Sequence, residues 1–98
     1  MNLMPYNAIT GTYTQDTEVE VQNFCNGYVA RNTGDTIVFV NGVRLLPAPG
    51  VGLSGESISV GGNLGEIYKG RIQVRFNAPL GAAPTVEITQ KFYLTEKR

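Results

Sequence analysis

The chain has no histidine, and this absence narrows the chemistry open to its 98 residues. Histidine is the side chain whose ordinary pKa lies nearest neutral pH, and it is the commonest metal ligand in proteins. Without it, Ser54, Ser57 and Ser59 have no imidazole to activate a hydroxyl in a serine–histidine–acid triad. We therefore expect a protein that is not an enzyme.

The acidic residues offer only weak alternatives for catalysis or metal binding. Asp35 would pair with Glu56 or Glu66 only if the fold brought them together, and nothing in their spacing requires it. A thin cluster of possible metal ligands consists of Asp16, Glu18 and Glu20. Because acids in loops usually form turns or stay solvated, we expect no metal site and no catalytic pair.

A glycine-rich segment raises the question of a nucleotide cofactor. Residues 50–55 match the spacing G-x-G-x-x-G, which binds a dinucleotide between a strand and a helix. Here Pro47 and Pro49 precede the glycines, and a strand pattern follows at residues 56–60. The segment therefore indicates a loop, and we expect no cofactor.

Cysteine and net charge are also scarce. Cys25 is the single cysteine, so no disulfide can form within the chain. Such a residue most often packs as a small hydrophobe, and a reactive thiol or an intermolecular bridge is the less common alternative.

Eight basic residues balance eight acidic ones. Since a neutral chain has no general attraction to nucleic acid or anionic lipid, we expect neither nucleic acid nor membrane as a partner.

Long hydrophobic runs are missing as well. No apolar run approaches the ~20 residues that span a bilayer. The first seven residues lack the basic and apolar regions of a secretory signal peptide. We expect synthesis in the cytoplasm without export by a signal peptide.

The strongest positive signal is Asn41-Gly42, which lies between two apolar runs. Asn-Gly fits a two-residue type I′ turn, because both central positions need a positive φ that these residues tolerate best. A two-residue loop also determines the pairing. The expected opposite pairs are Val40 with Val43, Phe39 with Arg44, Val38 with Leu45, and Ile37 with Leu46.

Both faces of this hairpin are largely apolar. One face carries Val38, Val40, Val43 and Leu45. The other carries Ile37, Phe39 and Leu46 with Arg44. Because exposed antiparallel strands usually have one polar face, either the hairpin lies between two layers or a partner covers its second face. The candidate interface residues are therefore Phe39, Arg44 and Leu46.

Short alternating runs surround the hairpin and are separated by many of the twelve glycines and five prolines. Besides the hairpin, we expect strands at residues 17–24, 28–31, 56–60, 67–76 and 85–94, turns at 26–27, 32–35 and 61–65, and a loop at 47–55. Seven or eight short strands predict a single all-β antiparallel sandwich, Ig-like or jelly-roll-like, over residues 17–98. Residues 1–16 are weakly periodic, so we expect an N-terminal arm or loosely ordered segment, which could dock or swap.

Charged and aromatic side chains have a place in this scheme. A basic stripe at Lys69, Arg71 and Arg75 would meet the acidic residues Glu18, Glu20 and Glu87 across neighbouring strands, with Glu87 on the hairpin partner of the basic strand. In the last strand we expect Phe92 and Leu94 to face inward and Tyr93 outward. We expect Tyr28 and Tyr93 to pack in the sandwich or at its rim with wet hydroxyls.

Part of the chain resembles a known class of viral protein. Residues 31–43, then Pro49-Gly50 and residues 55–66, resemble small β-sandwich virion proteins of tailed bacteriophages, of the head-decoration and fibre-anchoring type. The likeness covers about the middle third of the chain and consists of turn glycines and core aliphatics, so it transfers no functional residue. It implies a structural role in the virion as a homo-oligomer or bound to other virion proteins.

Two hypotheses follow. The first is a non-enzymatic structural or interaction protein that attaches to a virion surface, or oligomerises, through a sheet face or its arm. The alternative is a carbohydrate-binding module in which tyrosines stack on a glycan.

Overall fold

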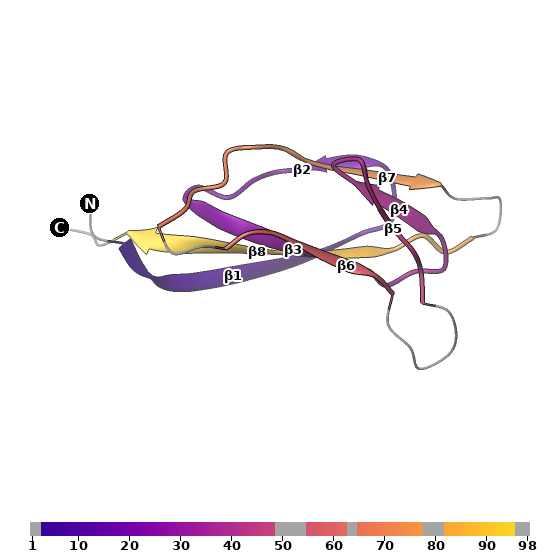
Figure 1. The fold of residues 1–98 in the computed structure, drawn as a ribbon, viewed down its shortest axis with the longest axis horizontal. Coiled ribbons are helices and arrows are strands. Elements are labelled where there is room, and N and C mark those ends of the chain that lie inside the picture. Colours follow the sequence, from indigo (N-terminus) through magenta and orange to yellow (C-terminus); the bar gives the residue numbers. More distant parts are fainter. Residues whose placement is uncertain (1–2, 49–54, 63–64, 78–81, 96–98) are drawn as a thin grey trace.

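The computed structural model describes residues 3–48, 55–62, 65–77 and 82–95, which form two antiparallel four-stranded sheets (Figure 1). The "β1 sheet" has the strand order β1-β8-β3-β6, and the "β4 sheet" has the order β2-β7-β4-β5. The strands are β1 Leu3–Tyr13, β2 Thr17–Val19, β3 Cys25–Asn32, β4 Ile37–Val40, β5 Val43–Leu45, β6 Ser57–Gly61, β7 Ile72–Asn77 and β8 Val86–Thr95. The prediction of a small all-β sandwich is confirmed. The described residues contain no helix of the length and apolarity needed to cross a membrane.

The core lies between the two sheets because alternate residues of each strand point to the same side. The β1 sheet supplies Tyr28, Ala30, Val86 and Ile88, and the β4 sheet supplies Val19, Val38, Val40, Leu45, Ile72 and Val74. All are at most 5% exposed. Since burial of a valine or leucine side chain is worth about 1.5–3 kcal/mol, this double layer is the main favourable contribution to folding.

The Asn41-Gly42 hairpin forms as predicted. Asn41 has φ 50° and Gly42 has φ 82°, and the paired residues are Val40–Val43, Phe39–Arg44 and Val38–Leu45. The expected fourth pair is not part of the ladder, because β5 ends at Leu45 and Ile37 pairs instead with Asn77 of β7. Val43 was expected to face the core but is 44% exposed at the end of the hairpin.

The turn expected at Asn26-Gly27 is wrong, because both residues lie inside β3. Asn26 is the extra residue of a β-bulge. Its buried side-chain Nδ2 donates to the Glu66 carbonyl and the Tyr93 hydroxyl. A Cβ on Gly27 would lie 2.3 Å from the Val60 carbonyl oxygen. The glycine is therefore required by the close approach of β6, not by a turn.

Two expected strands are shorter than the alternation suggested. The strand expected at residues 17–24 stops at Val19, because residues 20–22 bind a side chain instead of a neighbouring strand. Gln90 donates to the Glu20 carbonyl and accepts from the Gln22 amide. The strand expected at 67–76 begins at Ile72.

The segment before Ile72 is folded locally. The Tyr68 amide donates to the Cys25 carbonyl, and the Tyr68 hydroxyl donates to the Arg71 carbonyl. These contacts hold residues 68–71 outside the ladder. Lys69 and Arg71 therefore precede β7 and are not part of it.

Cys25 itself is fully buried, and burial raises the pKa of its thiol.

The last two strands do not form the hairpin that the sequence suggested. β7 belongs to the β4 sheet and β8 to the β1 sheet. Glu87 therefore lies opposite Arg31 of β3, with which it forms an ion pair at 3.2 Å. Tyr93, expected to face outward, is only 4% exposed, because its hydroxyl accepts from Asn26 and from the Gly65 amide.

The N-terminal segment also differs from expectation. Leu3–Tyr13, expected to be part of an arm or loosely ordered segment, forms β1 and pairs along its length with β8. The start of β1 and the end of β8 lie side by side at one end of the molecule (Figure 1). From Asn7 to Thr10 the side chains are exposed on both faces. The sequence therefore shows no alternation of apolar and polar residues there that would predict this edge strand. The loop expected at 47–55 lies largely outside the described residues.

The amide of Asn32 connects the two sheets. Asn32 ends β3 in the β1 sheet, and its Nδ2 donates to the carbonyls of Thr36 at 2.7 Å and Leu45 at 2.9 Å. Its Oδ1 accepts from the Gly34 amide at 3.0 Å. The side chain is 1% exposed, so these backbone groups have no water to replace it.

Replacing Asn32 with alanine should destabilise the fold by about 3 kcal/mol, because several buried backbone groups lose their partner at once. The midpoint of thermal unfolding should fall by roughly 10 °C or more. Urea denaturation followed by circular dichroism measures the change. Asn23→Ala, at an exposed position, is the matched control and should change stability by less than about 0.5 kcal/mol. Equal stability of the two variants would contradict the bridging role.

Candidate interaction surface

The outer face of the β4 sheet carries a row of three side chains across three strands. Phe39 of β4 lies opposite Arg44 of β5 on one side and Arg75 of β7 on the other. Phe39 is half-buried, and both arginines are exposed. We call this the "Arg–Phe–Arg row". It contains two of the three residues that the sequence proposed as an interface.

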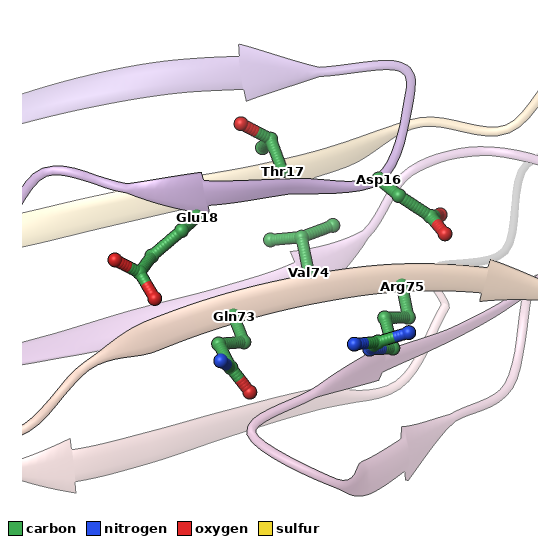
Figure 2. A pocket seen from close by; sticks show the side chains of 6 residues that line it. All are labelled: Asp16, Thr17, Glu18, Gln73, Val74 and Arg75. Atoms are coloured by element: carbon green, nitrogen blue, oxygen red, sulfur yellow. The ribbon is translucent and has the colours of Figure 1, made fainter.

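Two adjoining hollows lie beside the Phe39–Arg75 part of this row. One, of about 290 Å³, is lined by Phe39, Gly42, Gln73 and Arg75. The second, of about 260 Å³, is lined by Asp16, Thr17, Glu18, Gln73, Val74 and Arg75. Figure 2 shows Glu18, Gln73 and Arg75 projecting to the same side of β2 and β7. Because Gln73 and Arg75 line both hollows, the two form one uneven surface.

Leu46, the third predicted interface residue, lies apart from the row. It follows the end of β5 and lines neither hollow. The Glu56 carboxylate accepts from the Leu46 amide at 2.7 Å, and the Glu56 amide donates to the Leu46 carbonyl at 2.9 Å. Leu46 is 38% exposed, but it is not part of this surface.

Asn41 holds the turn of the hairpin and so positions the Arg–Phe–Arg row. Its backbone amide donates to the backbone carbonyl of Gln73 at 2.9 Å, and its side-chain Oδ1 accepts from the backbone amide of Gln73 at 2.8 Å. Its Nδ2 reaches the hydroxyls of Tyr28 at 3.0 Å and Tyr68 at 3.1 Å and the Arg71 carbonyl at 2.5 Å. The residue that the turn requires for its φ thus also ties the turn to β7 and to the β1 sheet.

The tyrosines under the turn form a compact pair. The rings of Tyr28 and Tyr68 meet edge to face, with centroids 5.4 Å apart and planes at 74°. Burial raises the pKa of the Tyr28 hydroxyl; the adjacent Tyr68 adds to the rise, and the hydrogen bond from Asn41 opposes it. The hydroxyl therefore stays protonated where a free phenol would begin to ionise.

The charges of this surface are partly matched within the molecule. Arg71 and Glu18 form an ion pair at 3.7 Å, as the pairing of basic and acidic stripes predicted. Both side chains are more than half exposed, so the pair is worth at most about 1 kcal/mol. The Asp16 carboxylate accepts a hydrogen bond from the backbone amide of Phe76 at 2.8 Å, so it already has a partner within the molecule. Arg44 and Arg75 keep exposed guanidinium groups beside Phe39.

Sequence reasoning missed part of this surface. Gln73 and Gly42 were not proposed as interface residues, and Arg75 was assigned to a charge stripe unconnected with Phe39. The information that connects Arg75 with Phe39 is the pairing of β4 with β7. That pairing links distant parts of the chain, and no turn motif announces it.

The tyrosines give little support to a glycan site. Tyr28 is 2% exposed and Tyr93 is 4% exposed, and both hydroxyls accept hydrogen bonds from asparagine amides. The expectation of wet hydroxyls is therefore wrong. Of the other tyrosine side chains that the structure describes, Tyr13 and Tyr68 are half-buried. The rings of Tyr28 and Tyr93 therefore cannot lie flat against a sugar.

Tyr28→Phe should show how the buried hydroxyl couples stability to pH. At pH 7 the variant should lose about 1 kcal/mol, because one acceptor of Asn41 is removed. Since the folded-state pKa lies above the ordinary value of ~10, the unfolded chain loses its proton first. The hydroxyl's contribution is thus complete below about pH 10 and is lost as the pH rises through the folded-state value.

The measurement is the free energy of urea unfolding at pH 8 and near pH 11. The difference between wild type and Tyr28→Phe should shrink or reverse at the higher pH. Val74→Ala, which removes buried methyl groups without a titrating group, is the control and should cost the same at both pH values. A Tyr28→Phe difference that does not change with pH would contradict the coupling.

Comparison with known proteins identifies no family for this chain. No family model matches the chain, and neither a curated protein nor a solved structure matches it. The functional assignment therefore depends on the residues of the Arg–Phe–Arg row and their surroundings.

Proposed function

We propose that the protein is a non-enzymatic structural subunit of a bacteriophage virion, of the capsid-decoration or fibre-associated kind. It attaches to another virion protein through the outer face of the β4 sheet. The observation that carries this proposal is the Arg–Phe–Arg row, an aromatic ring flanked by two arginines on a sheet face. Aromatic residues and arginine are the residue types most enriched at the energetic centres of protein interfaces.

The two outer faces of the sandwich differ in a way that supports this choice. The outer face of the β1 sheet carries polar and paired side chains, with Thr10 bonded to Thr89 and Arg31 paired with Glu87. A face of this kind is satisfied by water and by its own neighbours. The β4 face instead combines an incompletely covered ring with exposed cationic groups.

The charges define the partner's chemistry. Because Arg44 and Arg75 lie on opposite sides of Phe39, a matching surface presents an apolar group with carboxylates on both sides of it. Arginine binds carboxylates through two parallel hydrogen bonds, which fix orientation as well as add energy. The adjoining hollows leave room for side chains of the partner.

The test uses purified particles of the phage that encodes the chain. Mass spectrometry should detect the protein in particles purified through a density gradient. Recombinant protein should rebind particles from which it has been removed or deleted. Phe39→Asp should weaken that rebinding about 30-fold, since loss of a central interface residue costs about 2 kcal/mol. Arg75→Glu should weaken it as well.

Ser59→Asp is the matched control, because it places the same carboxylate on the exposed outer side of the other sheet. It should leave rebinding unchanged, and circular dichroism should show that all three variants are folded. Absence of the protein from purified particles, or equal rebinding of Phe39→Asp and wild type, would overturn the proposal.

A further inference from the structure

We infer that β1 is a self-association edge: it pairs antiparallel with β1 of a second copy about a two-fold axis, joining two β1 sheets into one continuous sheet. This contact is separate from the Arg–Phe–Arg row and does not depend on what that row binds. Within the described part of the chain, β1 pairs with β8 alone. One row of its backbone N–H and C=O groups therefore points away from the sheet.

From Tyr6 onward, β1 lacks the devices that normally protect a sheet edge. Natural edge strands are kept short or carry charges, prolines or bulges that prevent further pairing. β1 is eleven residues long and contains no charged side chain. Its proline, Pro5, lies at a bulge near the beginning, so the stretch from Tyr6 to Tyr13 is free of both proline and charge.

The other three edges of the two sheets are protected. β2 has three residues and carries Glu18, and β5 has three residues and carries Arg44. β6 has five residues and ends at Gly61; Gly61 and the following Gly62 have φ values of 76° and 101°, which turn the chain away from an extended course. Among the edges that the described strands form, only the β1 edge combines length, neutrality and, from Tyr6 to Tyr13, regular pairing.

A second copy of β1 is the occupant that this neutrality favours. Antiparallel pairing of two identical strands follows a two-fold axis, which brings the residue on the axis opposite itself and pairs residues that lie equally far on either side of it. A charged edge would meet its own charge, as Glu18 or Arg44 would. In β1 the residues that meet include asparagine, alanine, isoleucine, threonine, glycine and tyrosine, which carry no like charges to repel.

The side chain of Ile9 sets the register. Ile9 is 48% exposed, although it lies opposite the buried Gln90 and so faces the interior side of the sheet. A hollow of about 220 Å³ opens beside it, with Tyr13, Ile88 and Gln22 among its lining residues. With the two-fold axis at Ile9, the two Ile9 side chains meet on the same face, and each covers the other at this opening.

The same axis gives a pairing that cysteine substitutions can detect. Ile9 lies opposite Ile9 of the second copy, and Ala8 lies opposite Thr10. Under mild oxidation, Ile9→Cys should form a disulfide-linked dimer. Ala8→Cys and Thr10→Cys should not cross-link alone, because each would lie more than about 7 Å from its own copy. An equal mixture of these two variants should cross-link. The native Cys25 is fully buried and does not compete.

Sedimentation equilibrium of the full chain gives the second measurement. The wild type should be a dimer, and Ile9→Lys should weaken dimerisation at least 30-fold, because two ammonium groups would lie opposite each other. Val43→Lys is the matched control, since Val43 is 44% exposed and lies on the β4 sheet. It should leave the dimer intact. Circular dichroism shows whether both variants are folded.

Each outcome decides the matter. A wild-type monomer, a dimer that Ile9→Lys leaves intact, or cross-linking that does not follow the predicted register would overturn the edge pairing. A dimer broken by Phe39→Asp but not by Ile9→Lys would assign self-association to the other face. Loss of the dimer with retained particle binding would leave the proposed function standing, so the two proposals fail independently.

Discussion

The side-chain amide of Asn32 is the contact on which the placement of one sheet against the other depends. Packing of valine, leucine and isoleucine between two layers stabilises the sandwich but does not by itself define one alignment, because the hydrophobic effect has no direction. Asn32 belongs to β3, yet it donates to the carbonyls of Thr36 and Leu45 at the base of the β4–β5 hairpin. A shift of either sheet would leave these buried groups without partners, so directional hydrogen bonds select one arrangement of an otherwise tolerant core.

Asn41 applies the same kind of constraint at the other end of the hairpin. Its backbone and amide bind Gln73, and its Nδ2 reaches the two tyrosine hydroxyls that lie beneath the turn. The hairpin is thus held at its base by one asparagine and at its tip by another. Phe39 lies between these two anchors on a strand with little freedom to move. A rigid surface loses less entropy when a partner binds, which makes the Arg–Phe–Arg row better suited to recognition than a loop would be.

The sequence predicted those features that local chemistry determines. An Asn-Gly pair between apolar runs specified the central hairpin and its register, and therefore the neighbourhood of Phe39 and Arg44. The same dipeptide at Asn26-Gly27 misled, because there the glycine answers a close approach of β6 and the asparagine makes buried contacts. Nothing within a few residues distinguishes these two causes. The position of Arg75 beside Phe39 was likewise beyond reach, since it follows from strands that pair across a long stretch of chain.

The two proposed contacts have a joint geometric consequence. Antiparallel pairing at β1 follows a two-fold axis perpendicular to the sheet, so residues opposite each other share a face and both β4 sheets lie on the same side of the enlarged β1 sheet. The outer faces of those β4 sheets stay uncovered, because joining two edges extends a sheet within its own plane. The dimer would therefore present two Arg–Phe–Arg rows in the same direction. A single row around one aromatic residue is a small contact, but two rows on one rigid body bind a repetitive surface with an affinity well above either alone. Edge pairing thus supplies what a small interface lacks, and a repeating particle surface is the kind of partner that rewards it.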